Sequence, residues 1–132
     1  IEFEQKDYIQ QKAIKYIKGN QRLDGGWGED GETYFSKNLN STKTSTPSQT
    51  AWAVLGLISA GELNSNEVSH GINYLIENYS ENNWDEKFYT AVGFPKVFYL
   101  KYHGYSRYFP ILAISKYVSL KNSNSLKPLH GV

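Results

Sequence analysis

The sequence contains neither cysteine nor methionine among its 132 residues. Without cysteine, disulfide bonds and thiolate metal sites are excluded, and the redox compartment stays open. No apolar run is long enough to span a membrane, and the first residues have no signal-peptide pattern. Because the chain opens with Ile1-Glu2-Phe3 and has no methionine, we expect a processed or excised piece of something longer.

Strong charge of one sign is also lacking. The formal net charge is +1 and charged residues make up 20% of the chain, so nothing favours nucleic acid as a partner. The three histidines, His70, His103 and His130, have no metal-ligand spacing, and we expect surface or capping roles for them. What the chain has in excess is aromatic side chains, with 11 Tyr, 6 Phe and 3 Trp. Such rings bury large areas and offer π-faces to cations.

The apolar periodicity predicts an all-α chain. The run Thr46-Pro47-Ser48-Gln49 is a strong helix start, with a capping hydroxyl, proline at the first position and glutamine at the third. We expect helices over about residues 4–18, from Thr46 to Gly61, over about 66–79, and from about Pro95 to Tyr117 with a break near Gly104 or Pro110. Residues 1–120 then form one helical segment, and residues 121–132 form a polar tail.

An internal repeat relates residues 12–29 to residues 69–86. Each copy has an amphipathic helix, a short turn, a tryptophan and then acidic residues. Repeated helix pairs cannot bury their faces alone and therefore stack on neighbours. Two copies are fewer than such an array normally needs, which again indicates missing chain.

The first copy contains a Q-x-x-x-G-x-W motif formed by Gln21, Gly25 and Trp27. A glutamine side chain can bond backbone groups at a helix end and lie against the indole, while glycine allows a tight turn beneath the ring. We therefore expect a structural staple between a helix and its neighbour. The nearby carboxylates lack the residue order of a calcium loop.

The second copy departs from this motif. Trp84 remains, but Tyr79 stands where glutamine is expected and Asn82 where glycine is expected. The turn is also one residue shorter. These changes weaken the case for a second staple without altering the expected fold.

An aromatic series follows the second copy. Phe94, Phe98, Tyr102 and Tyr105 are spaced at i, i+4, i+8 and i+11, which would place them on one face of a helix. Such a stripe is either an ordinary core or the wall of a dry cavity that stabilises cations without supplying a nucleophile.

Three runs resemble the C-terminal part of the squalene–hopene and oxidosqualene cyclases. They are QRLDGGWGED, STPSQTAWAVLGLISAGE and FYTAVGFPKVFYLKYHGYSRYFPILAISKY, and the resemblance covers about residues 8–119. It implies a helical segment of an α/α-barrel with QW-type repeats. It also implies an enzyme that protonates a linear polyprene and guides a carbocation through ring closures, with no metal or organic cofactor. The parent would be a monotopic protein on the cytoplasmic side of the membrane.

The resemblance also implies roles for single residues. Phe94 and Phe98 fall where the family has cation-stabilising phenylalanines, and Leu100 falls at an apolar cavity position. Tyr102 and Tyr105 fall where tyrosines line or orient the cavity wall. After Tyr105 the family usually has arginine directly, whereas here Ser106 intervenes.

The initiating acid of the bacterial family is an Asp-x-Asp-Asp cluster, and this sequence contains no such string. We therefore expect the segment to have no catalytic residue of its own and to be inactive without the preceding chain of the cyclase. Squalene is the default substrate, and a related C35 polyprene is an alternative. A different alternative is a non-catalytic helical module that binds a hydrophobic ligand or a protein partner.

Overall fold

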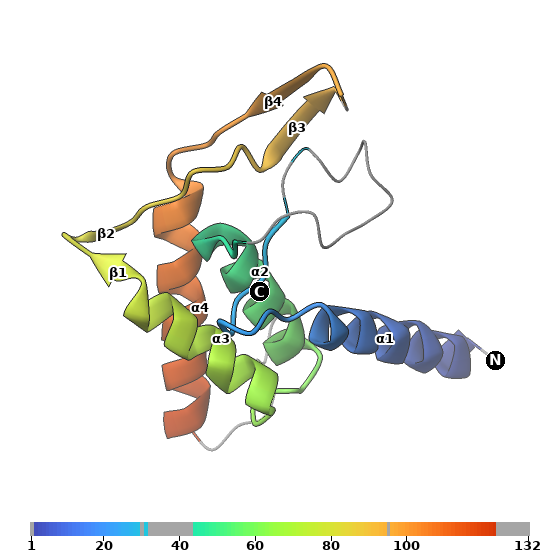
Figure 1. The fold of residues 1–132 in the computed structure, drawn as a ribbon. Coiled ribbons are helices and arrows are strands. Elements are labelled where there is room, and N and C mark those ends of the chain that lie inside the picture. Colours follow the sequence, from blue (N-terminus) through green and yellow to red (C-terminus); the bar gives the residue numbers. More distant parts are fainter. Residues whose placement is uncertain (1, 30, 32–43, 95, 124–132) are drawn as a thin grey trace.

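The structure is a computed structural model that describes residues 2–29, 31, 44–94 and 96–123 (Figure 1). The elements in chain order are α1 (Glu2–Gly19), α2 (Pro47–Ser59), α3 (Asn66–Glu77), β1 (Tyr79–Ser80), β2 (Asn83–Trp84), β3 (Ala91–Phe94), β4 (Phe98–Leu100) and α4 (Tyr105–Asn122). The helices expected near residues 4–18, 46–61 and 66–79 are therefore confirmed, with small differences at their ends.

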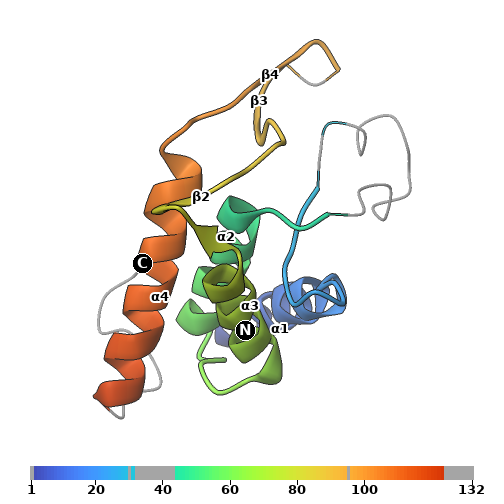
Figure 2. The same ribbon diagram turned by 60° about the vertical axis from the view of Figure 1, so that its left-hand side comes forward.

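The central helix is α2, which contacts each of the other three helices (Figures 1 and 2). Thr46 caps it as expected, because the Thr46 hydroxyl accepts a hydrogen bond from the Gln49 N–H. The chain leaves the helix through Gly61, whose φ of +90° suits glycine. Because α2 is apolar nearly all round, helices pack against several of its faces.

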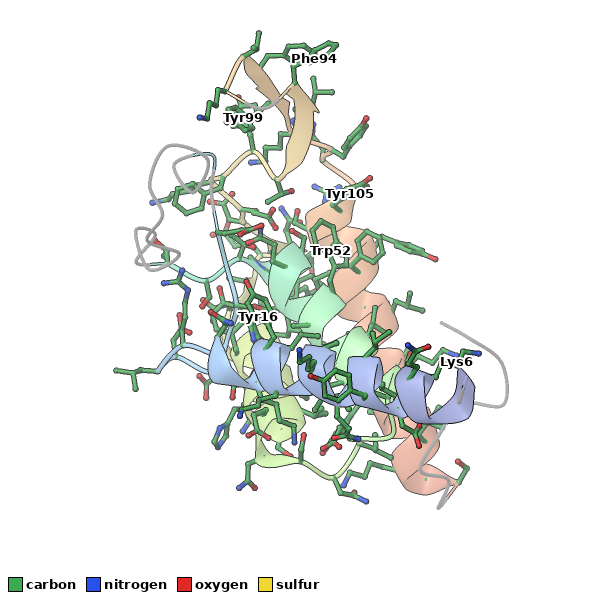
Figure 3. The ribbon with its side chains drawn as sticks, turned by 90° about the vertical axis from the view of Figure 1, so that its right-hand side faces the viewer. Lys6, Tyr16, Trp52, Phe94, Tyr99 and Tyr105 are labelled. Carbon is green, nitrogen blue, oxygen red and sulfur yellow. The ribbon has the colours of Figure 1, made fainter. Side chains whose placement is uncertain are left out.

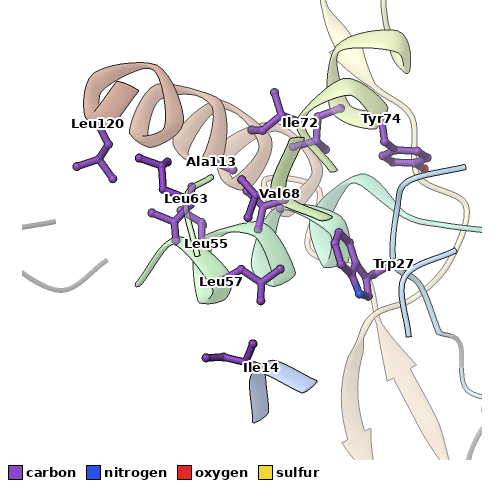
Figure 4. Close-up of a cluster of buried hydrophobic side chains, with 14 residues drawn as sticks. Ile14, Trp27, Leu55, Leu57, Leu63, Val68, Ile72, Tyr74, Ala113 and Leu120 are labelled. Carbon is purple, nitrogen blue, oxygen red and sulfur yellow. The ribbon is translucent and has the colours of Figure 1, made fainter. Parts of the chain in front are cut away.

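The core lies where α2 meets α3 and α4 (Figure 4). Leu57 and Val54 of α2 are fully buried, as are Val68 and Leu75 of α3. Helix α4 contributes the buried side chains of Pro110, Ala113 and Leu120. Each large aliphatic side chain buried in this way contributes about 1.5–3 kcal/mol relative to exposure.

Helix α1 projects to one side of this three-helix cluster (Figure 1). Among residues 5–19 of this helix only Ile14 belongs to the buried core, while Tyr8, Ile9 and Tyr16 are each about 60% exposed. The C-terminal end of α1 is also held by an ion pair, in which the Lys18 Nζ lies 2.6 Å from a Glu62 carboxylate oxygen.

The helix expected from about Pro95 to Tyr117, with a break near Gly104 or Pro110, is wrong in the part before Gly104. Strands β3 and β4 form an antiparallel hairpin with a bulge beside Phe94, and α4 begins only at Tyr105. The hairpin strands are rich in aromatic and branched residues, which suit a pleated surface better than a helix. Lys96, in the turn, has a φ of +65°, which no helix accommodates. Gly104 is the N-cap of α4, and the helix continues through the buried Pro110.

The polar tail expected from residue 121 lies mostly outside the described residues. Lys121 and Asn122 belong to α4, which ends at that point. Over the described ranges, no helix is both long enough and apolar enough to cross a membrane.

The ion pairs of Lys18 give a test of how α1 is held. We expect Lys18→Met to lower the free energy of unfolding by roughly 0.5–1 kcal/mol, because Lys18 pairs with Glu62 and, at 3.5 Å, with Glu67. Urea unfolding followed by tryptophan fluorescence measures the loss. Lys15→Met, on an exposed position of the same helix, is the matched control. Equal effects of the two substitutions would contradict the proposed anchoring.

The ion pairs of Lys18 with Glu62 and Glu67 also predict that the free energy of unfolding depends on pH. Hydrogen bonding to its own backbone, followed by the charge of Lys18, holds the pKa of Glu67 below its ordinary value of 4.5. Its contribution to stability is therefore present above pH 4.5 and lost as the pH falls through the lower folded-state pKa. The hydrogen bond to Glu62 raises the pKa of Lys18 above 10.5, so its contribution is lost only as the pH rises beyond that value. Lys18→Met should reduce both dependences.

Candidate functional site

The turn after α1 places Trp27 between α1 and α2. The indole is only 6% exposed. Its Nε1–H donates a hydrogen bond of 2.7 Å to the carbonyl of Ile17, in the last turn of α1 where carbonyls lack helical partners. The backbone N–H of Trp27 donates to the Thr50 hydroxyl at 2.9 Å, and the Trp27 carbonyl accepts from the Thr46 N–H at 2.9 Å. One residue thus joins the end of α1 to the start of α2.

Gln21 ties the same turn to α3. Its amide nitrogen donates to the Gly25 carbonyl at 2.8 Å and to the Glu67 carbonyl, in the first turn of α3, at 2.9 Å. The side chain that bonds the Ile17 carbonyl at the end of α1, which also accepts from the Asn20 N–H at 3.1 Å, is the indole of Trp27 and not the glutamine. Gly25 has a φ of +85°, and a Cβ there would lie 2.7 Å from the His70 carbonyl oxygen. Glycine is therefore required at this position.

Gly71 is a requirement that sequence reasoning missed. A Cβ on this residue of α3 would lie 2.5 Å from a Val54 methyl and 3.0 Å from the Trp27 ring. The indole fits against α3 only because that side chain is absent. Glycine inside a helix is unfavourable by about 1 kcal/mol relative to alanine. A glycine in the middle of the helix predicted over residues 66–79 could therefore have indicated a close contact at this position.

The second tryptophan repeats the geometry of the first. Trp84 is 6% exposed, and its Nε1–H donates to the Leu75 carbonyl, in the last turn of α3, at 2.6 Å. Tyr79, which replaces the glutamine, packs its ring on the indole with centroids 4.6 Å apart. Asn82, which replaces the glycine, has a φ of +63°, a value that asparagine tolerates well. The substituted positions therefore still support an indole bonded to a helix end.

Glu86 is a buried carboxylate that sequence reasoning also missed. It is 5% exposed and accepts hydrogen bonds from the N–H and the hydroxyl of Ser48, at 3.0 and 2.8 Å, in the first turn of α2. A negative charge is favourable at a helix N-terminus. The Glu86 carbonyl also accepts a hydrogen bond from the Lys101 ammonium group, which follows β4. The W-x-E pattern shared by Trp27-Gly28-Glu29 and Trp84-Asp85-Glu86 was the signal for this position.

The predicted aromatic stripe is divided between two places (Figure 3). Phe94 and Phe98 face each other across the hairpin, with ring centroids 5.4 Å apart, and are 64% and 43% exposed. Leu100, on β4, is 44% exposed. Tyr102 and Tyr105 lie beyond the hairpin, and their rings stack with centroids 4.9 Å apart. The structure therefore does not bring these residues onto one helical face.

Tyr105 lies beside Trp52 of α2 (Figure 3). The Trp52 ring makes edge contacts with Tyr105 at 5.6 Å and with Phe109 at 5.4 Å between centroids. Trp52 also lines a cleft of about 310 Å³, together with Tyr16, Trp27 and Thr90 among others.

The ionisable groups of the described residues form no metal-like cluster. His70 and His103 are exposed, and His130 lies outside the described residues. Across the part of the chain that the structure describes, no three histidine or carboxylate side chains are grouped as metal ligands would be. Among the described residues, burial raises the pKa of the Tyr74 hydroxyl to about 12. The Tyr74 hydroxyl donates to the Ser45 carbonyl at 2.9 Å, so it links α3 to the segment that precedes α2 and has a structural role.

Helices whose ends are bonded by tryptophans from repeated turns, with further apolar surface exposed, are typical of stacked helix-pair proteins of the α/α-barrel type. The chain belongs to the squalene-hopene cyclase C-terminal domain family, which matches residues 1–119. That domain is the α/α-barrel domain of the terpene cyclases.

Similar proteins include two bacterial enzymes and one from a fern. The squalene–hopene cyclase of Zymomonas mobilis is 49% identical over 116 residues, which is 86% of this chain and 18% of that protein. The squalene–hopene cyclase of Bradyrhizobium diazoefficiens is 47% identical over 90% of this chain, and the dammaradiene synthase of Dryopteris crassirhizoma is 40% identical over 91%. The chain spans about 18% of the length of these relatives.

The Trp27 contacts predict a stabilising role. We expect Trp27→Ala to lower the free energy of unfolding by about 3–5 kcal/mol, because a buried ring and its hydrogen bond are lost together. Thermal and urea unfolding of the chain measure this, and Leu23→Ala, at a fully exposed position of the same turn, is the control. In the cyclase that contains this segment, a loss of activity with unchanged stability would contradict the structural role.

Proposed function

We propose that this chain forms part of the substrate-cavity wall of a class II triterpene cyclase, and that its aromatic side chains stabilise carbocations formed from a linear polyprene. The observation that carries the proposal is the pair Phe94 and Phe98, which face each other in an edge contact and remain largely exposed on a chain of this family. Exposed apolar side chains that lie next to each other, as these two do, are typical of surfaces that contact a ligand or another part of a protein.

The chemistry of such a cavity favours these side chains. A carbocation beside a hydroxyl, amine or water is quenched, whereas an aromatic face attracts it by its quadrupole, worth about 2 kcal/mol or more per ring when desolvated. Leu100 supplies apolar wall on the same hairpin. Tyr102 and Tyr105 supply two further rings next to the hairpin, stacked on each other.

The initiating proton comes from elsewhere in this proposal. No Asp-x-Asp-Asp string occurs in the sequence, and the buried carboxylate of Glu86 is hydrogen-bonded to the start of α2. Both oxygens of that carboxylate are engaged by the N–H and the hydroxyl of Ser48, so its role is to hold the second tryptophan turn against α2. The acid must then be contributed by the rest of a full-length cyclase.

The partners follow from the same reasoning. The relatives are about five times as long as this chain, since the matched residues span about 18% of each. The remaining chain of the cyclase would cover the exposed aromatic and aliphatic surface of α1, the hairpin and α4. The polyprene would be squalene, the substrate that the names of the bacterial relatives state, with a C35 polyprene as the alternative. A peripheral, monotopic attachment of the full-length enzyme to the membrane is part of this proposal.

The cavity role is tested with Phe94→Ala and Phe98→Ala in the full-length cyclase. We expect prematurely terminated products with fewer rings, because a late cation loses its aromatic partner and is deprotonated early. Gas chromatography with mass spectrometry of the hydrocarbons formed from squalene measures this. Val97→Ala, a 75% exposed position in the turn of the same hairpin, is the control and should leave the products unchanged. An unchanged profile for both phenylalanine variants would remove them from the cavity.

The missing acid is tested by expressing the 132-residue chain alone and incubating it with squalene and with a C35 polyprene. We expect no conversion, and we expect the chain to associate and to bind an apolar dye through its exposed rings. Turnover by the chain alone would contradict the proposed dependence on an external acid. A clean monomer without dye binding, together with a full-length protein that converts no polyprene, would favour a non-catalytic helical module.

A further inference from the structure

Trp52 is the tryptophan that belongs to neither repeated motif, and it stands in the middle of an aromatic cluster. Its ring meets the rings of Tyr105 and Phe109 edge to face, at 5.6 and 5.4 Å between centroids. Tyr105 and Phe109 also meet each other at 5.3 Å, and Tyr102 stacks on Tyr105 at 4.9 Å. Edge-to-face geometry is the favoured arrangement of aromatic pairs, so these contacts define an orientation and not only a location.

The base of this cluster is rigid. Trp52 follows Thr50 and Ala51, both 0% exposed, in the part of α2 that is fixed to Trp27 and Glu86. Phe109 packs against the main hydrophobic core from α4. Two rings on well-packed helices therefore form two sides of a socket for Tyr105.

Tyr105 and Tyr102 have little else to orient them. Tyr105 is the first residue of α4, after an N-cap glycine that makes no side-chain capping bond, and Tyr102 is 51% exposed. The Tyr105 N–H donates to the Tyr102 carbonyl at 3.0 Å, which fixes the backbone of this turn but not the orientation of the two rings. The ring contacts with Trp52 and Phe109 must then supply the restraint.

We infer that Trp52 is a positioning residue, which fixes the orientation of Tyr105 and, through the stack, of Tyr102. This inference rests on the proposed function, since it takes the two tyrosines to face the polyprene. If a tyrosine ring turns away from the cavity, the cationic intermediate beside it is no longer stabilised. It can then be deprotonated before cyclisation is complete. Loss of Trp52 should therefore change which products form and not only how much product forms.

The test uses the full-length cyclase with Trp52→Leu, Tyr105→Leu and the double variant. Product mixtures from squalene are analysed by gas chromatography with mass spectrometry, well below each variant's unfolding temperature. We expect Trp52→Leu to raise the by-product fraction about threefold or more, with the same by-products as Tyr105→Leu. The by-product fraction of the double variant should be little higher than that of either single variant, because both substitutions disrupt the same group of contacting rings.

Two further variants separate positioning from stability. Trp84→Leu removes a buried tryptophan outside the cluster and should lower the unfolding temperature while leaving the product ratio unchanged. Trp52→Phe keeps a ring at the position and should give an intermediate by-product fraction, which keeps the test valid even where Trp52→Leu does not fold.

The outcomes distinguish this inference from the proposed function. Wild-type product ratios for both Trp52→Leu and Trp52→Phe, or effects of Trp52→Leu and Tyr105→Leu that simply add, would overturn the positioning role. If the Trp52 variants give either of these results while Phe94→Ala or Phe98→Ala changes the products, the positioning role is wrong and the cavity proposal is kept. A full-length enzyme that converts no polyprene would overturn both.

Discussion

The polar first turn of α2 is the constraint on which the rest of the structure depends. The side chains of Ser48, Gln49 and Thr50 each bond a segment distant in sequence. Ser48 holds the Glu86 carboxylate, Gln49 exchanges two hydrogen bonds with the Glu29 backbone, and Thr50 holds the backbone of Trp27. Ser48 and Thr50 are 0% exposed, so an unpaired hydroxyl there would be costly. Both tryptophan turns are thereby docked on the helix that forms the centre of the core.

This docking explains why the second repeat keeps its geometry although its sequence has diverged. Each turn has an indole bonded to the last turn of the preceding helix, and two positions later a residue that bonds the first turn of α2. Glu29 makes this contact through its backbone and Glu86 through its carboxylate. Trp84 and Glu86 supply both, and neither bond involves Tyr79 or Asn82. Glutamine matters in the first copy because Gln21 reaches the Glu67 carbonyl of α3. The second turn leads instead into β2 and the hairpin.

The sequence predicted the helices well where a local signal existed and failed where the determinant was distant. The Thr46-Pro47 start and the Gly61 stop are encoded within a few residues, and the structure confirms both. The roles of Thr46 and Gln49 at this helix start are only partly local. The Gln49 side chain also bonds the Glu29 backbone, and the Thr46 N–H bonds the Trp27 carbonyl. Helical spacing at Phe94, Phe98, Tyr102 and Tyr105 was misleading, since a hairpin with a bulge also pairs Phe94 with Phe98. The repeated W-x-E pattern marked the position of Glu86, but nothing local indicated its partner Ser48, which lies 38 residues away.

The division of the aromatic residues into two places has a physical consequence for a cavity wall. A two-stranded hairpin is marginally stable by itself, and this one is joined to the helices through Lys101 and the Glu86 carbonyl. The directions of Phe94 and Phe98 therefore depend on whatever packs over the hairpin in a longer chain. Tyr105 differs, because its socket of Trp52 and Phe109 lies entirely within the helices described here. Under the proposed cavity role, the core of this chain would fix the orientation of Tyr105. The orientations of Phe94 and Phe98 would be fixed only when the rest of the barrel packs over the hairpin, which would tie their geometry to complete folding.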